Sequence, residues 1–324
     1  MAMNLLHRLG RAAPAPVYAA LGTGGADRAG PLSGRPGLRL VPSIRHAAIL
    51  LVAGAIRDGD RQHLRQLHDQ MPHPRKTVWW GARPFHEMTD PVIVEPQDDP
   101  AACIAGLWRG LLSGALASEA GLLPDKPAHE WRGRGDHGQG GEGMMGGTPY
   151  GRPMAMPEDD LRDGLALDSF TCAFGPFLAI LPPGMQLEIT LQGDVIQSAK
   201  VRRPPYAPAT IDSSASLRKA LMQLMGGAKM GARHALPPDL GHICGTSLRD
   251  RFDGQVPGPA KGALPRLADL LPGLEWNEAI LLINSIPHSL LQQMCPVDED
   301  TDHAGGSGKR GAHAQGQSKR GDGG

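Results

Sequence analysis

Cysteine is scarce in this sequence of 324 residues, and its distribution limits the chemistry of the chain. The four cysteines, Cys103, Cys172, Cys244 and Cys295, stand far apart. Isolated cysteines argue against a disulfide scaffold and favour a reducing compartment. An iron-sulfur cubane needs several converging thiolates, commonly from close sequence pairs, and no such set is present. We therefore expect no iron-sulfur cluster.

Long apolar runs and an excess of charge of one sign are also missing. No apolar stretch approaches the ~20 residues that a membrane-spanning helix needs. The N-terminus carries Leu5, Leu6 and Leu9 but has no apolar core adequate for a secretion signal. Lys and Arg total 33, as do Asp and Glu, so no global field favours nucleic acid or anionic lipid.

Aromatic residues make up only 4% of the chain, whereas there are 44 glycines and 30 prolines. That composition predicts much loop. The length nevertheless leaves room for two modest cores.

Three short apolar runs are typical of strands in a parallel sheet: Ala47–Val52, Thr77–Trp80 and Val92–Val94. Between the first two, Asp60 can cap a helix that carries Leu64 and Leu67 on one face, and Pro72 and Pro74 end that helix. A second helix follows Pro100. This alternation predicts an α/β fold with a flavodoxin-like βαβ domain.

A different pattern follows the middle of the chain. Met185, Leu187, Ile189 and Leu191 alternate with polar residues, which predicts a strand with one buried face. Gln192-Gly193-Asp194 is a plausible hairpin turn into a further strand, Val195–Val201. Downstream we expect helices, one carrying Leu217 to Met225 and one over Trp276–Met294 with a kink at Pro287.

The sequence thus divides into six regions. They are an N-terminal lead (1–35), the α/β domain (36–124), a Gly/His/Pro/Met-rich linker (125–165), a small β unit (166–206), a helical region (207–295) and a disordered tail (296–324).

Several smaller signals favour structural roles. Gly22-Thr23-Gly24-Gly25 lacks the Gly-Lys-Ser/Thr ending of a phosphate-binding loop, so we expect a plain turn. Trp79 and Trp80 are typical of core residues, and Cys103 is expected to act as a small buried hydrophobe. We assign no catalytic, cofactor-binding or metal-binding residue.

The run from Pro42 to Gly81 resembles the small, iron-sulfur subunit shared by respiratory complex I and membrane-bound NiFe hydrogenases. The matching residues are Pro42, Ser43, Arg45, His46, Ala47–Gly54, Leu64–Met71, Pro72, Pro74, Arg75 and Gly81. The element Asp69-Gln70-Met71-Pro72-His73-Pro74 is the most specific part. The opening Leu5–Arg11 is also similar to the lead of hydrogenase-type small subunits.

That family holds a tetranuclear cluster, and its ligand positions differ here. The segment Gly22–Leu40 contains no cysteine, Arg83 follows the second strand, and Gln97-Asp98-Asp99 stands where the family has its third cysteine position. The resemblance therefore implies the fold without the 4Fe-4S cofactor.

A second stretch, Gly175-Pro176 and then Gly184–Ile196, resembles the N-terminal β unit of the large subunit of the same assemblies. Phe177–Gly184 has no histidine where that family places its pocket histidine. Arg202-Arg203-Pro204-Pro205-Tyr206 replaces the family motif that follows, and the paired cysteines that bind NiFe are absent.

These resemblances imply a non-catalytic structural or assembly subunit of a complex I-like or membrane-hydrogenase-like respiratory complex. Its partners would be other subunits of the assembly, and it would be cytoplasmic and peripheral on the inner face of the cell membrane. One alternative is a redox-active subunit of an NADH-quinone oxidoreductase or hydrogenase-type complex, with its cofactor at a partner interface. A free-standing enzyme on an α/β fold is a third class, which no residue constellation supports.

The alternating face of the β unit must be covered. We expect a partner subunit to cover it, so that the isolated chain is unstable or aggregates; the alternative is that the helices of residues 207–295 cover it internally.

Overall fold

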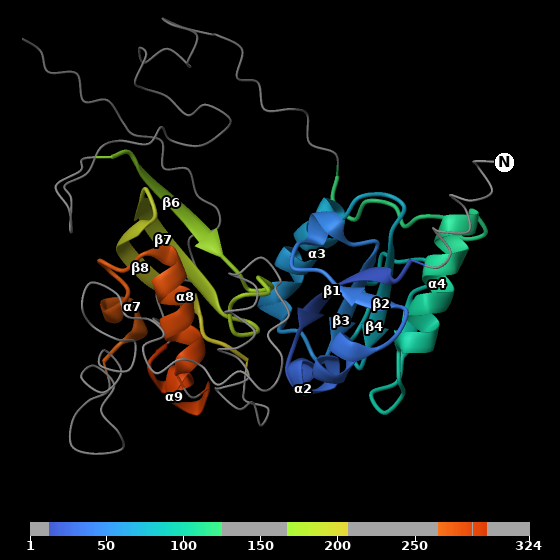
Figure 1. The fold of residues 1–324 in the computed structure, drawn as a ribbon, viewed down its shortest axis with the longest axis horizontal. Helices are drawn as coiled ribbons and strands as arrows, with labels where there is room; N and C mark the ends of the chain where they lie inside the picture. The colour runs from blue at the N-terminus through green and yellow to red at the C-terminus, as the bar shows by residue number, and fades with distance from the viewer. Residues whose placement is uncertain (1–12, 125–166, 207–264, 287, 297–324) are drawn as a thin grey trace, which may run out of the picture.

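Two units, one with a parallel and one with an antiparallel sheet, lie side by side in the computed structural model (Figure 1). The structure describes residues 13–124, 167–206, 265–286 and 288–296. We call residues 13–124 the α/β unit, and residues 167–206 with the C-terminal helices the β unit.

The sheet of the α/β unit has five strands, all parallel, in the order β2-β1-β3-β4-β5. The strands are β1 (Ala15–Leu21), β2 (Leu38–Leu40), β3 (Ile49–Ala53), β4 (Lys76–Trp80) and β5 (Val92–Val94). This is a flavodoxin-like sheet, so the predicted fold class is confirmed, and the three predicted strands are β3, β4 and β5.

The sheet begins earlier in the chain than predicted, because β1 falls within the predicted N-terminal lead. β1 lies between β2 and β3, and it pairs with β3 from Val17–Ile49 to Leu21–Ala53. Its sequence, rich in alanine and holding Pro16, lacks the run of large aliphatic residues that marks β3. The α/β unit therefore extends N-terminal to the predicted boundary at residue 36.

Helices cover both faces of this sheet. They are α2 (Gly25–Ala29), α3 (Arg61–Gln70) and α4 (Ala101–Ser113), with three short 3₁₀ turns, η1 (Gly30–Gly34), η2 (Ile44–His46) and η3 (Asp58–Asp60). On one face Leu64 of α3 packs with Leu50 and Trp79. On the other face Ile104 and Leu111 of α4 pack with the alternate strand residues. Trp79 and Trp80 are core residues, as predicted, whereas Cys103 is only half-buried.

The β unit is a three-stranded antiparallel sheet in the order β6-β7-β8. Its strands are β6 (Ser169–Phe174), β7 (Gln186–Gln192) and β8 (Val195–Arg203). The predicted hairpin joins β7 to β8, with Gly193 at φ 62°, a left-handed conformation that glycine adopts without steric penalty.

Short helices cover the apolar face of this sheet, so the internal alternative is the one found. They are α7 (Leu267–Leu270), α8 (Trp276–Ser285) and α9 (His288–Gln293). Met185, Leu187 and Ile189 of the β unit are fully buried in one cluster with residues of these helices. The single kinked helix predicted for Trp276–Met294 is two helices, because helical backbone ends at Ser285, shortly before Pro287.

Other predictions fall outside the described residues. These are the linker at 125–165, the helix carrying Leu217 to Met225, and the tail beyond Pro296. Among the residues that the structure describes, no helix is long and apolar enough to cross a membrane.

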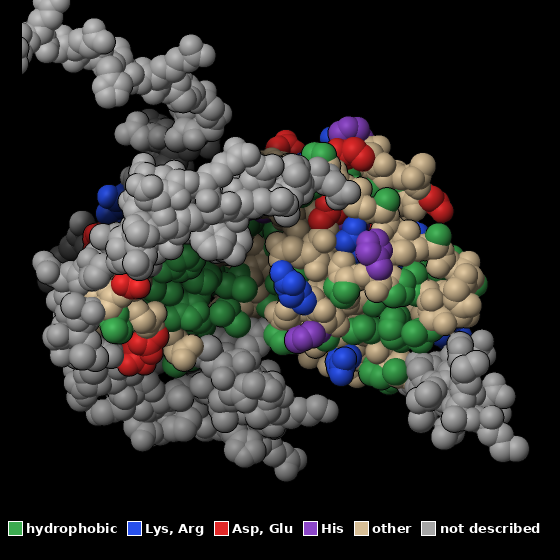
Figure 2. Space-filling view, turned by 90° about the horizontal axis from the view of Figure 1, so that it is seen from above, with side chains coloured by type: hydrophobic (Ala, Val, Ile, Leu, Met, Phe, Trp, Pro, Cys, Tyr) green, Lys and Arg blue, Asp and Glu red, His purple; other side chains and the backbone are tan. Residues whose placement is uncertain are grey.

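The two units differ in surface character. The face seen in Figure 2 carries side chains of both charge signs on the α/β unit and a concentration of hydrophobic side chains on the β unit. Leu167 and Phe170, at the start of β6, are 47% and 44% exposed. The mixed charges agree with a chain that has no net electrostatic preference for polyanions.

One aromatic residue of the β unit completes the core of the α/β unit. Phe177, 7% exposed, belongs to the cluster that contains Tyr18, Val52 and Trp79. The Tyr18 hydroxyl donates a hydrogen bond to the carbonyl of Phe177. Burial raises the pKa of Tyr18 to about 12. The two units therefore share apolar contacts and are not merely tethered.

We predict that Phe177→Ala destabilises the protein by about 3 kcal/mol, a typical result of truncating a buried Phe. Phe170→Ala is the matched control, because Phe170 is a phenylalanine of the same unit that is largely exposed. Urea unfolding of both variants measures the difference. Equal losses from the two substitutions would contradict the shared core.

Candidate functional site

The carboxyl edge of the parallel sheet is the usual ligand-binding edge in folds of this type, at the point where the strand order reverses. That point lies between β1 and β3. Here the two loops bond to each other: Gly22 N–H donates to Ala53 O, and Thr23 N–H donates to Ala55 O, both at 2.8 Å. A Cβ on Gly22 would lie 2.4 Å from Ala55 O. The Gly22–Gly25 loop is thus a packed turn, as predicted.

The β unit closes part of this region. Pro176–Pro183 lies against Ala19 and Leu21 of β1, leaving a cavity of about 20 Å³. Cavities that bind small organic ligands are commonly some 300–1,000 Å³, so this one is far too small for a cofactor.

The residues at the cluster-ligand positions of the resembled family do not converge on a metal site. Arg83 is exposed and lies beyond the end of β4. Cys103 is on α4, Cys172 is on β6 and Cys295 follows α9. Cys244 lies outside the described residues. Within the part of the chain that is described, no group of three or more His, Cys, Asp or Glu side chains could hold a metal ion.

The principal polar site lies at the contact between the two units and is centred on Asp60, which has no exposed surface. One carboxylate oxygen accepts a hydrogen bond from the Tyr206 hydroxyl at 2.7 Å and another from Arg57 Nε at 2.8 Å. The second oxygen lies 3.2 Å from Arg203 Nη1, in an ion pair whose geometry is not that of a hydrogen bond. Two of these three partners come from the β unit.

The prediction that the Asp60 side chain caps α3 is wrong. Asp60 occupies the N-cap position of α3, but its side chain makes no capping hydrogen bond. Its oxygens face Arg57, Arg203 and Tyr206 instead. No local pattern could reveal this, because Tyr206 is 146 residues away in the sequence.

Arg57 adds further links between the units. Its guanidinium donates to the carbonyl of Gly184, and to that of Pro204 at 2.9 Å. Its Cζ also lies 4.3 Å from the centroid of the Tyr206 ring, within the range of a cation–π contact. Burial raises the pKa of Tyr206, and the hydrogen bond that its hydroxyl donates to Asp60 raises it further. The phenol therefore stays protonated and remains a donor.

Two glycines make room for side chains of the junction: Gly59 for the Arg203 guanidinium of the β unit, and Gly184 for the Tyr206 ring within the β unit. A Cβ on Gly59 would lie 2.5 Å from Arg203 Nη1, and a Cβ on Gly184 would lie 2.5 Å from the Tyr206 ring. Gly184 also has φ 82°, a conformation that L side chains rarely adopt.

His63 of α3 contributes a peripheral contact, with Nε2 3.0 Å from the amide nitrogen of Gln186. Burial lowers the pKa of His63, and the positive charge of Arg203 lowers it further. We call Arg57, Asp60, His63, Arg203 and Tyr206 the Asp60 junction. Its groups are directed at other protein groups, which is typical of a structural link, whereas an acid/base centre must reach a substrate.

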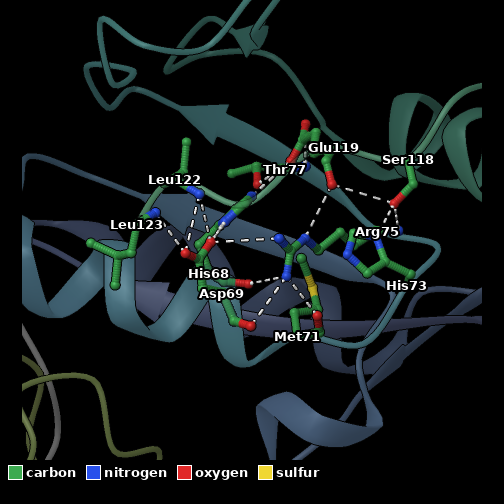
Figure 3. A network of polar contacts seen from close by, with 10 residues as sticks. All are labelled: His68, Asp69, Met71, His73, Arg75, Thr77, Ser118, Glu119, Leu122 and Leu123. Carbon is green, nitrogen blue, oxygen red and sulfur yellow. Dashed lines mark hydrogen bonds and ion pairs between the residues drawn. The ribbon is translucent and has the colours of Figure 1, made fainter. Parts of the chain in front are cut away.

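A second polar network holds residues 118–123 against α3 and β4 (Figure 3). The Glu119 carboxylate accepts hydrogen bonds from Thr77 N–H at 2.9 Å and Thr77 Oγ1 at 2.7 Å. Fully buried His68 lies between two carboxylates, with Nε2 3.2 Å from Glu119 and Nδ1 2.7 Å from Asp69.

Arg75, only 3% exposed, completes the end of α3 (Figure 3). Its Nη1 donates to the carbonyls of His68 at 3.1 Å, Asp69 at 3.2 Å and Met71 at 2.8 Å. The carbonyl of His68 also accepts the backbone N–H of Met71 at 3.1 Å. The carbonyls of Asp69 and Met71 lie at the helix C-terminus, where intrahelical partners are lacking, and the arginine side chain supplies a donor there. The motif from Asp69 to Arg75 therefore has a structural role here.

Asp69 binds the C-terminal end of the segment 118–123. Its carboxylate accepts hydrogen bonds from the backbone N–H groups of Leu122 at 2.9 Å and Leu123 at 2.8 Å. Burial acts to raise the pKa of Asp69, but these bonds and the contact with His68 together outweigh it and leave the pKa lowered.

The network does not form a catalytic triad. His73 Nδ1 lies 2.7 Å from Ser118 Oγ, which also accepts a hydrogen bond from Arg75 N–H at 3.0 Å. In the described part of the chain no carboxylate contacts His73, so the third group that orients a catalytic base is missing there. Both polar sites are best explained as links that hold segments together.

Comparison with known proteins adds no relative. No protein-family model matches the chain, and no curated protein matches it. The resemblances therefore rest on the motifs quoted above.

We predict that Asp60→Asn destabilises the folded protein by roughly 3 kcal/mol, because it leaves Arg57 and Arg203 without their buried counter-charge. Asp58→Asn is the control, since Asp58 is exposed two residues away and its loss should change stability by about 0.5 kcal/mol or less. Urea unfolding at neutral pH compares the two. A loss from Asp60→Asn no greater than the control's would refute the junction.

A further prediction concerns the pH dependence of the Asp69 contacts. Because the folded-state pKa of Asp69 is depressed, its carboxylate contributes stability above its ordinary pKa of 3.8 and loses that contribution as the pH falls through the folded-state value. Asp69→Asn should therefore lower the free energy of unfolding at pH 6, and the difference from wild type should shrink below about pH 4. A pH-independent difference, measured by urea unfolding from pH 3 to 7, would count against this.

Proposed function

We propose that this protein is a non-catalytic structural or assembly subunit of a complex I-like or membrane-hydrogenase-like respiratory complex. The observation that carries the proposal is the arrangement of the two units. The segment resembling the small subunit and the segment resembling the large-subunit β unit form two different sheets, and they meet at the Asp60 junction and around Phe177.

The chemistry of the residues supports a structural role over a catalytic one. The switch point of the sheet is occupied by the chain's own loops, and the groups of the Asp60 junction contact other residues of the same chain. A βαβ unit without iron ligands can still dock against a neighbouring subunit, because docking depends on surface shape and charge.

The proposed location is peripheral, on the cytoplasmic face of the membrane, held by partner subunits. Leu167, just before β6, and Phe170, near its start, offer exposed apolar surface for such contacts. The alternative, a redox-active subunit, has the same fold but requires a cluster or quinone at the interface with a partner.

Two experiments test the structural proposal and its redox-active alternative. The first is affinity purification of the full chain from native membranes in mild detergent. We expect membrane subunits of a complex I-like or hydrogenase-like assembly to co-purify. After anaerobic reconstitution of the isolated chain, we expect no stoichiometric iron or acid-labile sulfide and no cluster signal in ultraviolet-visible or paramagnetic spectra.

Recovery of the chain only as a free monomer, without membrane-derived partners, would contradict the proposal. Co-purification together with a cluster signal that depends on this chain would favour the redox-active alternative.

A further inference from the structure

The loop that follows β4 is fixed in place by two arginines of α3. Phe85 of this loop is 2% exposed, and its ring packs edge-on against Trp79 with centroids 5.1 Å apart. The Cζ atoms of Arg61 and Arg65 lie 4.9 Å and 4.5 Å from the Phe85 centroid, both within cation–π range. The aromatic ring therefore anchors the loop to the unit's core and to α3.

Hydrogen bonds hold the backbone of the same loop. Arg61 donates to the carbonyl of Arg83 at 3.2 Å and to that of Pro84 at 2.8 Å. Arg65 forms an ion pair with Glu87 at 2.8 Å, just beyond the loop. A loop with this many contacts loses little conformational entropy on binding a partner.

Arg83 projects from this fixed loop. Its side chain is exposed and makes no hydrogen bond or ion pair with any other residue in the described part of the protein. Positive charges lie close together here. Burial lowers the pKa of Arg61, and the positive charges of Arg65 and Arg83 lower it further. The nearby carboxylates are those of Asp58 and Glu87, and Glu87 already pairs with Arg65. The surface thus keeps an excess of positive charge.

Chemistry favours carboxylates as the complement of this surface. A guanidinium binds carboxylate and phosphate in the same bidentate geometry. Polyanion and membrane binding, however, rest on a broad basic field or a long basic cluster, whereas here three arginines stand among acidic neighbours in a chain of balanced charge. A short acidic stretch of a partner protein is the ligand of matching size.

We propose that the surface formed by Arg61, Arg65 and Arg83 docks an acidic segment of a partner protein, with Arg83 as its principal contact. This inference rests on the proposed function only for the source of the partner, a neighbouring subunit. The surface adjoins the Asp60 junction, because α3 follows Asp60 directly.

The test uses the full chain and a hexaglutamate peptide as the probe, titrated at low and at physiological ionic strength. Arg83→Glu should weaken peptide binding at least about tenfold, and added salt should weaken the wild-type interaction. Arg109→Glu is the charge-matched control, because Arg109 is an exposed arginine on α4, across the sheet from α3. Thermal unfolding checks that both variants fold.

Three outcomes would overturn the inference. In the first, Arg83→Glu binds the peptide as tightly as wild type does; in the second, Arg109→Glu loses as much peptide binding as Arg83→Glu. In the third, the protein binds phosphatidylserine vesicles through Arg83 and does not bind the peptide. The proposed function fails separately. If wild type and Arg83→Glu both retain their membrane partners, only this inference is wrong; if wild type has none, the proposed function is wrong whatever the peptide does.

Discussion

The arrangement of the two units in this protein depends on the contacts of one fully buried carboxylate, that of Asp60. Removing a carboxylate from water is unfavourable unless charged and hydrogen-bonding partners replace the solvent. Here Arg57 supplies one partner from the same unit, while Tyr206 and Arg203 supply the others from the β unit. The α/β unit alone would leave Asp60 only partly compensated, so the two units stabilise each other.

The apolar contacts act in the same direction. One face of the parallel sheet is covered partly by α3 and partly by Phe177, so the core of the α/β unit is complete only when the β unit is in place. In turn, α7, α8 and α9 cover the apolar face of the antiparallel sheet. Gly59 leaves room for the guanidinium of Arg203 from the β unit, and Gly184 leaves room for the Tyr206 ring within the β unit. The contact between the units is therefore continuous with both cores.

Local sequence patterns predicted most of the fold and little of the polar chemistry. The apolar runs of β3, β4 and β5, and the alternation of β7, mark strands because burial dictates their composition. β1 was missed because three of its seven residues are alanine and one is proline, and its place in the sheet comes from backbone pairing with β3. Pro287 marked an interruption between α8 and α9, where a single kinked helix was predicted.

The functional side chains were hidden for a different reason. Asp60 has the local signature of a helix cap, and its true partners are brought to it only by the tertiary fold. Arg75 and Glu119 likewise meet across more than forty residues. By contrast, the sequence alone shows that Arg83 stands where the resembled family has a cysteine, because the identity of a residue can be read without the tertiary structure.

The two units that resemble parts of two different subunits contact each other within one chain. The polar groups of the Asp60 junction and of the network around residues 118–123 bind other segments of the same chain.

Native-state hydrogen exchange tests the central claim, that the two units form one cooperative body. The claim predicts that backbone amides of β3 and β7 exchange through the same global opening, with equal free energies and equal dependence on urea. If the amides of β7 open at a distinctly lower free energy while those of β3 remain protected, the units are independent and the account is contradicted.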